Sequence, residues 1–170
     1  SFTLTARNPG GHSSQPRPDN AIYELADALK ALQGYSFPVM WNDWTIGSFK
    51  ASAPVTPGEL GQAMAQFGAN PGDAEAAAVL AKNPAMIGRT RTTCVATMLT
   101  GGHADNALPQ SATATVNCRI FPGTSVAEVR DSLQQVVGDR IEVQVLGEPH
   151  SSPPSPLRDD VLEAVTQAVR

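Results

Sequence analysis

The sequence predicts an α+β domain: a four-stranded antiparallel sheet with two main helices on one face, in the order β-α-β-β-α-β, plus a helical insertion. Three observations support this fold class. Some segments alternate apolar and polar residues, as strands do, and two longer segments repeat apolar residues at helical spacing. The 14 Gly and 14 Pro among 170 residues predict many turns and short elements between them.

The first two elements are a strand and a helix. The opening segment SFTLTAR alternates apolar and polar residues, which is typical of a strand with one buried face. An amphipathic helix follows, with Asp19 or Asn20 as its N-cap and Gly34 as its stop. Its apolar face comprises Ile22, Leu25, Ala26, Leu29 and Leu32.

Residues from about 38 to 91 form the insertion. The segment FPVMWNDWTIGSF is mixed in character, whereas TPGELGQAMAQFGA and NPGDAEAAAVLAKNP are typical of short helices that begin at a proline. After the insertion, TTCVATML and SATATVNCRIF alternate on either side of TGGHADNALPQ, which is rich in turn-forming residues. We therefore expect two antiparallel strands joined by a long loop.

Alternation assigns residues of the second of these strands to two faces. Arg119 lies on the open face, because its neighbours on the core face are apolar. Cys94 and Cys118 fall on the predicted core face, and neither has the C-x-x-C spacing of a zinc or redox site. We interpret them as small buried hydrophobic residues. The pattern alone leaves open whether they lie close enough to pair.

The last part of the domain contains a helix and a strand. The helix runs from Ser125 to Val137, with a capping box between Ser125 and Glu128 and Gly138 as its stop. The strand RIEVQVLG follows, and we expect the domain to comprise residues 1–148. Residues 149–170 are predicted to form a linker and one helix, whose apolar stripe has no partner in a two-layer domain. This stripe consists of Leu157, Val161, Val165 and Val169.

Charge and hydropathy exclude several partners. The formal net charge is -4, and the basic residues are scattered, which argues against nucleic acid or an anionic membrane as a partner. No segment approaches the roughly 18 to 20 apolar residues of a membrane span. The chain begins in a strand without an initiating Met, so we interpret it as a piece of a longer protein whose compartment the sequence does not indicate.

Three polar residues remain as candidates for a functional site. The histidines His12, His103 and His150 lie in separate turns without a metal-binding motif, so we predict no metal site within the chain. Two serines follow His12, but neighbouring side chains rarely form the hydrogen bond that nucleophilic catalysis needs, and no G-x-S-x-G motif is present. His12 and Asn106 could donate to an oxyanion, and Arg119 could hold a carboxylate. From the pattern alone, a turn histidine and an Asx-turn residue explain His12 and Asn106 better than a functional role does, and a solvated strand residue explains Arg119 equally well.

Two segments resemble a known family. GGHSSQPRPDNAIYELADAL is similar to a G-x-x-x-H-[SA] motif followed by P-x-x-x-x-N-A, and GGHADNALPQSATATVNCRIFPGTS is similar to G-G-x-x-x-N-x-[LI]-P-x-x-A with a later Arg. Both occur in the inserted dimerisation, or lid, domain of the zinc-dependent aminoacylase and carboxypeptidase family. That family includes glutamate carboxypeptidase, succinyl-diaminopimelate desuccinylase, carnosinase and carboxypeptidase S. The resemblance covers nearly the whole chain and is greatest for the carboxypeptidase S-like branch.

The resemblance implies a function that this chain only assists. Such enzymes hydrolyse amide bonds of short peptides or N-acyl amino acids, using two zinc ions held by a catalytic domain that this chain lacks. In the lid, His12 matches the histidine that stabilises the oxyanion, often in the partner subunit of a homodimer. Asn106 matches a loop asparagine, and Arg119 matches the arginine that binds the substrate carboxylate. The chain alone is therefore expected to be inactive.

Two alternative functions are also compatible with the sequence. One is a stand-alone α+β module that oligomerises or binds a small carboxylate at Arg119 without catalysis. The other is a monomeric lid, in which the insertion near Trp41 and Trp44 covers the edge strand or the first helix. The chain departs from the simplest lids in its longer insertion and in His103, and either feature would affect substrate choice or the dimer surface.

Overall fold

The computed structural model describes residues 1–169, without the side chain of Val169. They divide into two compact units, one of residues 1–38 and 91–152 and the other of residues 39–90 and 153–169. Val169, the last residue of the apolar stripe predicted for the final helix, is thus outside the described side chains. Arg170 lies outside the described residues.

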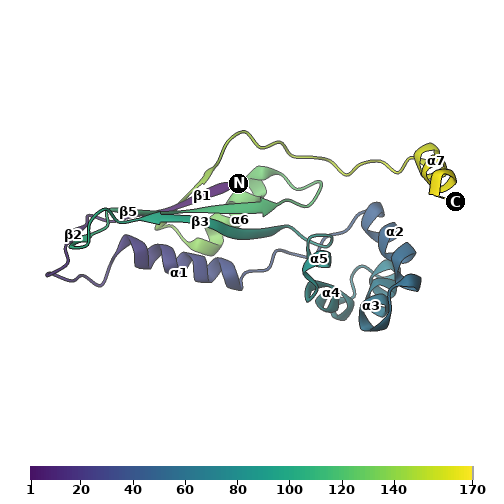
Figure 1. Ribbon diagram of the computed structural model, residues 1–170, viewed down its shortest axis with the longest axis horizontal. Coiled ribbons are helices and arrows are strands. Elements are labelled where there is room, and N and C mark those ends of the chain that lie inside the picture. The colour runs from purple at the N-terminus through teal and green to yellow at the C-terminus, as the bar shows by residue number, and fades with distance from the viewer. Residues whose placement is uncertain (170) are drawn as a thin grey trace. The chain divides into compact units, whose positions relative to one another are not determined.

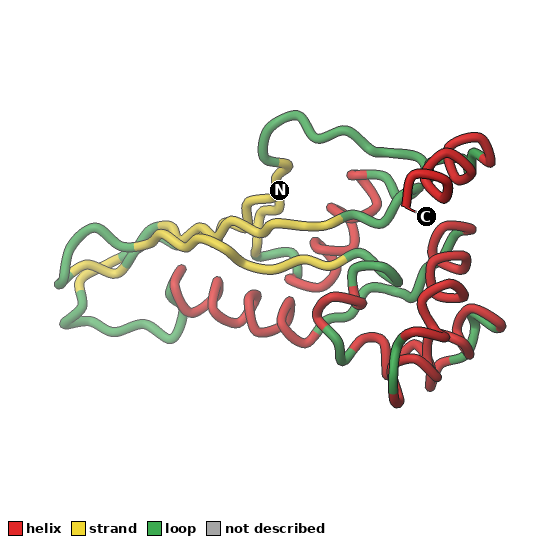
Figure 2. The backbone as a smooth tube through the Cα atoms, turned by 45° about the vertical axis from the view of Figure 1, so that its right-hand side comes forward, coloured by secondary structure: helices red, strands yellow, loops and turns green. Residues whose placement is uncertain are grey.

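The first unit is built on a four-stranded antiparallel sheet, which confirms the predicted fold class (Figure 1). The strands lie in the order β3-β5-β1-β6, so β1 has a neighbour on each side and β3 lies at an edge. Figure 2 shows the strands of this unit as extended yellow segments beside red helices. The strands are β1 (Phe2–Arg7), β3 (Thr93–Gly101), β5 (Ser111–Arg119) and β6 (Ile141–Val145).

Two helices, α1 (Ala21–Gly34) and α6 (Val126–Val137), cover one face of this sheet. Leu25 of α1 and Leu133 of α6 are fully buried with Leu4 of the central strand in one hydrophobic core. The opposite face carries the exposed Val95 and Met98 on the edge strand β3. On β1, β5 and β6 it is polar, as the alternation predicts. The hydroxyls of Thr5 and Thr113, for example, lie 3.0 Å apart across β1 and β5.

The helix ends follow the capping signals of the sequence. Of the two predicted N-caps for α1, Asn20 has this role, because its side-chain oxygen accepts the N–H of Ile22 at 2.8 Å. The capping box of α6 is confirmed, since the Ser125 hydroxyl accepts the N–H of Glu128 and the Glu128 carboxylate accepts the N–H of Ser125. Gly138 ends this helix with a φ of 79°.

The predicted hairpin loop between β3 and β5 contains one strand of an additional short ladder. Its strand β4 (Ala107–Leu108) pairs with β2 (Gly11–His12), which follows β1. No pattern in the sequence predicts this two-stranded sheet. In Figure 1, β2 lies beyond the N-terminal end of β5.

The predicted core-face position of the two cysteines agrees with the structure, and their pairing, which the pattern left open, is now given: Cys94 and Cys118 form a disulfide. The register of β3 and β5 places them directly opposite one another, with their Cα atoms 4.1 Å apart. Both lie on the helix-covered side of the sheet, packed against the core. Register is a property of strand pairing, so neither spacing nor composition could reveal the bond.

The second unit contains the predicted helical insertion, with its own core around Phe49 and Phe67, whose rings meet edge to face at 5.6 Å. The mixed segment FPVMWNDWTIGSF includes an unpredicted helix, which Asn42 caps. Asp73, and not a proline, caps the helix of NPGDAEAAAVLAKNP. The elements are α2 (Asp43–Ser52), η1 (Ala53–Val55), α3 (Gly58–Ala69), α4 (Ala74–Ala81) and α5 (Pro84–Ile87).

The predicted last helix is α7 (Asp159–Val169), which follows a segment without helix or strand at residues 146–158. Leu157, Val161 and Val165 of the predicted stripe are substantially exposed. Among the described residues, no helix has both the length and the apolar character that a membrane crossing requires.

Candidate functional site

His12 lies on the short ladder at one end of the sheet. Its strand pairs Gly11 with Leu108 and His12 with Ala107. The preceding turn depends on Gly10, which is buried and has a φ of 77°. A Cβ at Gly10 would lie 2.8 Å from Gln110 Cγ and 3.0 Å from the Leu108 carbonyl oxygen, so only glycine fits this approach between the two strands.

The His12 ring is held by the serine two residues later. The backbone N–H of Ser14 donates to His12 Nδ1 at 3.2 Å, and the Ser14 hydroxyl lies 2.8 Å from the same nitrogen. Because a backbone N–H can only donate, Nδ1 is the acceptor, and the neutral ring carries its hydrogen on Nε2. The ring is exposed, so His12 presents an N–H donor to whatever lies beyond the ladder.

The prediction that the neighbouring serines would not hydrogen-bond to His12 is therefore wrong for Ser14. A serine nucleophile would also need a third group to orient the histidine through its other ring nitrogen. Among residues 1–169, no carboxylate is hydrogen-bonded to the His12 ring. The contact therefore fixes the ring and its tautomer.

Asn106 lies beside His12, as both backbones meet at the end of the ladder. The N–H of Ser13 donates to the Asn106 carbonyl oxygen at 2.9 Å. The Asn106 side chain is exposed. The structure thus brings together two of the three predicted site residues.

Arg119 lies at the other end of β5. It is exposed on the open face of the sheet, as the alternation predicts, and pairs with Thr93 at the start of β3. The distance along β5 from Ser111, at the His12 end, to Arg119 is about 26 Å at about 3.3 Å per residue. Within residues 1–169 the Arg119 guanidinium forms no ion pair. One chain therefore does not bring Arg119 to His12.

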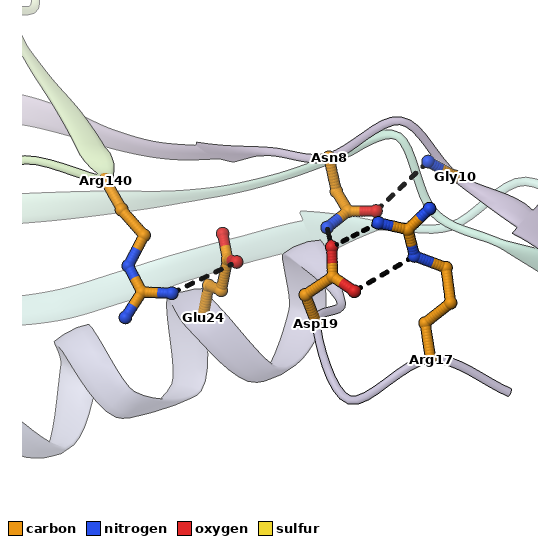
Figure 3. Close-up of polar contacts among 6 residues, drawn as sticks. All are labelled: Asn8, Gly10, Arg17, Asp19, Glu24 and Arg140. Atoms are coloured by element: carbon orange, nitrogen blue, oxygen red, sulfur yellow. Dashed lines mark hydrogen bonds and ion pairs between the residues drawn. The ribbon is translucent and has the colours of Figure 1, made fainter.

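A polar network that the sequence analysis did not identify links the His12 turn to helix α1 (Figure 3). Asn8 Nδ2 donates to Asp19 at 2.9 Å, and Arg17 donates to both Asp19 oxygens, at 2.9 and 2.7 Å. The bonds from Arg17, followed by the bond from Asn8, hold the pKa of the Asp19 carboxyl well below its usual range. The only advance signal was the R-x-D spacing of Arg17 and Asp19, which many exposed loops share.

A second ion pair in the same view joins Arg140, which precedes β6, to Glu24 of α1, with Nη1 and Oε1 3.8 Å apart (Figure 3). These groups line a depression of about 530 Å³ that also includes Asp19 and Asp27. None of the three predicted site residues lines it.

The described residues do not supply a metal site. Within residues 1–169, no three His, Cys, Asp or Glu side chains converge as ligands. Asp19, which bonds to Asn8 in the turn before His12, is already hydrogen-bonded to Arg17 as well. A zinc ion therefore has no fitting set of donors in this part of the protein.

Comparisons with known proteins agree with the resemblance found in the sequence. The sequence model of the family described as "Peptidase dimerisation domain" matches residues 1–143. The chain is 32% identical over 155 residues to the N-fatty-acyl-amino acid synthase/hydrolase PM20D1 of Xenopus tropicalis, covering 90% of this chain and 30% of that protein. It is 30% identical over 132 residues to a probable carboxypeptidase S-like 2 of Dictyostelium discoideum, covering 76% and 24% of the two chains.

Among the solved structures that match is a crystal structure of an M20 family metallo-carboxypeptidase, Sso-CP2, from Sulfolobus solfataricus. Its TM-score is 0.48 at 15% sequence identity, with 84% of this chain and 41% of that chain covered. The chain spans less than a third of the length of the two curated relatives described above.

Proposed function

This chain belongs to the M20 peptidase dimerisation domain family, and from that membership we propose that it is the dimer-forming lid of a metal-dependent amidohydrolase. The similar proteins are named as an N-fatty-acyl-amino acid synthase/hydrolase and as a probable carboxypeptidase S-like protein. The substrate class proposed here is therefore a short peptide or an N-acyl amino acid. The two zinc ions that such an enzyme uses would be held by a catalytic domain outside these 170 residues.

The observation that carries the proposal is the orientation of the His12 ring. Because Ser14 donates to Nδ1, the Nε2–H is free to donate outward from an exposed ladder. Amide hydrolysis passes through a tetrahedral intermediate whose carbonyl oxygen becomes negative, and a fixed N–H donor stabilises that oxygen. Asn106, whose backbone bonds to the residue after His12, offers a second donor at the same end of the lid.

Arg119 supplies the complementary function, which is binding of the free carboxylate of the substrate. Its guanidinium is exposed and forms no ion pair within residues 1–169, so no internal carboxylate competes for it. A guanidinium binds a carboxylate through two parallel hydrogen bonds, which fixes the orientation of the substrate as well as its charge.

The separation of His12 and Arg119 favours a dimer. In an N-acyl amino acid the amide carbonyl and the carboxylate are about one residue apart, or about 4 Å. In one chain the backbone of Arg119 lies roughly 26 Å along β5 from the end at which His12 is found, which is farther than the two side chains can bridge. If both act on one substrate, they must come from two different copies of the chain.

The edge strand β3 is the surface that we propose for this pairing. It contains no charged residue and no proline, the features that usually protect an edge, and Val95, Met98 and Leu99 are exposed along it. Ile22 of α1, which approaches the end of β3 near Gly101, is also exposed. A second copy would cover this apolar edge.

The test replaces His12 in the whole protein. His12→Ala should lower kcat on the order of 100-fold, because an oxyanion donor is lost. His12→Gln, which keeps an N–H near the position of Nε2, should lose less, and His150→Ala in the linker should leave kcat unchanged. Equal turnover of wild type and His12→Ala, measured by release of the free amino acid, would remove His12 from the mechanism.

A further inference from the structure

The position of the His12 ring depends on few contacts. Its strand forms only two residue pairs, and the residue itself is exposed. A catalytic hydrogen-bond donor is effective only when it is held within about 0.5 Å of its productive position. The turn before His12 and the loop after it must therefore provide the remaining support.

The turn before His12 is organised by Asn8. Its backbone N–H donates to the Gln110 carbonyl at 2.9 Å, and its side-chain oxygen accepts the N–H of Gly10 at 3.1 Å. Gly10 is the residue whose positive φ and close approach to Leu108 direct the chain into β2. The side chain of Asn8 thus sets the start of the strand that carries His12.

Asp19 determines which way the Asn8 amide faces. The Gly10 N–H can only donate, and an ionised carboxylate can only accept. With these two partners on either side, the amide has one orientation that satisfies both, with its oxygen toward Gly10 and its nitrogen 2.9 Å from Asp19 Oδ2. A neutral or absent group at position 19 would remove this constraint.

Asp19 is itself fixed at both its side chain and its backbone. Arg17 binds both of its oxygens, and Asn20, the next residue, caps helix α1. The contact between Asn8 and Asp19 spans 11 positions and closes a loop that contains His12 (Figure 3). Both ends of this loop are therefore tied to the core, one through β1 and the other through α1.

Given the oxyanion role proposed above for His12, we propose that Asp19 is a positioning residue for that histidine. Its carboxylate, held by Arg17, fastens the Asn8 turn to the start of α1 and so fixes the strand that carries the ring. Asp19 itself touches no substrate. It acts through Asn8 and Gly10.

The first experiment measures hydrogen exchange of single amides in this chain by NMR, without any activity. Asp19→Ala should speed exchange of the Gly10 and Ser13 amides about tenfold, because the loop opens more often once a hydrogen bond to a charged group is lost. Arg17→Ala should have a smaller effect in the same direction, and Asp19→Glu should restore part of the protection. The matched control is Asp131→Ala, since Asp131 is likewise an exposed carboxylate paired with an arginine, on α6. Unchanged Gly10 and Ser13 exchange in Asp19→Ala would overturn the proposal.

The second experiment compares steady-state kinetics in the whole protein. Asp19→Ala should lower kcat about tenfold with little change in KM, Asp19→Glu should recover part of it, and Asp131→Ala should match wild type. If His12→Ala loses turnover while Asp19→Ala keeps it, positioning by Asp19 is refuted although the role of His12 stands. If His12→Ala keeps full turnover, the role proposed for His12 fails, and the exchange data alone decide whether Asp19 holds the loop.

Discussion

The two ends of strand β5 hold their candidate residues by different means. At the Arg119 end, the neighbouring residue Cys118 is joined covalently to Cys94 of β3, and strand pairing continues to Thr93. At the other end, His12 lies on a two-residue ladder beyond Ser111. There the support comes from hydrogen bonds of polar side chains, chiefly Asn8 and Asp19.

The difference means that the two groups of the proposed site are held by different numbers and kinds of contacts. A residue within a long ladder takes its position from many backbone bonds, so single changes elsewhere have little effect on it. A residue on a short ladder depends on a few side chains, and each becomes important. We therefore expect distant substitutions to affect His12 more than Arg119.

The largest expected effect comes from removing the disulfide at the Arg119 end of β5. Replacing both Cys94 and Cys118 with Ala should lower the free energy of unfolding by about 3 kcal/mol, because the bridge closes a loop across 24 positions of the chain. Denaturant unfolding without reductant would measure the loss. Exchange of the Gly10 amide should stay at the wild-type rate, and a matching increase there would show that the two ends are not independent.

Substitution at Arg119 should separate the two ends by kinetic parameter. Arg119→Ala should raise KM roughly 10- to 100-fold with kcat less affected, because a hydrogen-bonded charge pair with the substrate carboxylate is lost. His12→Ala should instead lower kcat, with KM less affected. Arg119→Lys is the control, since it keeps the charge without the planar pair of donors. For a substrate whose carboxyl is amidated, wild type and Arg119→Ala should have the same KM.

Mixed dimers test whether the two ends act in trans. In a dimer of one His12→Ala copy and one Arg119→Ala copy, one site would contain both intact residues and the other neither. Random assembly after co-expression should therefore recover about a quarter of wild-type activity from two variants that are each impaired alone. Adding Leu99→Lys on the β3 edge of both copies should abolish the recovery, and light scattering should show monomers. Recovery no greater than the sum of the separate variants would contradict action in trans.

The smallest expected effect is the response of the His12 loop to acid. The pKa of Asp19 is lowered in the folded chain, so its contribution to holding the loop is complete above the ordinary carboxyl value of about 4 and is lost only as the pH falls through the lower folded value. Protection of the Gly10 amide, corrected for intrinsic exchange, should thus persist from pH 7 to about pH 4. In Arg17→Ala the loss should begin at higher pH. Identical acid profiles for the two proteins would contradict the assigned cause.

Much of the first unit could be predicted because its signals are local. The alternation in β1 and β5 gave the two faces of the sheet, including the open-face position of Arg119. The capping box at Ser125 gave the start of α6. In each case neighbours within four residues determine the outcome, so a pattern in one sequence is sufficient.

The features that escaped prediction depend on pairs of distant residues. The ladder of His12 and Ala107 is too short for any periodicity, and the disulfide follows from a register that aligns Cys94 with Cys118. The contact of Asn8 with Asp19 joins the two ends of a loop. Helix α2 was missed because its buried residues Thr45 and Phe49 are held by packing in the second unit, within a segment of weak helical pattern.

The disulfide also limits how the exposed edge of the sheet can be used. Strand β3 is bonded to β5 near its start, so it stays in its own sheet while the bridge is intact. Domain swapping requires a strand to leave one copy and complete the sheet of another. Two oxidised copies can therefore add their edges side by side, but they cannot exchange β3.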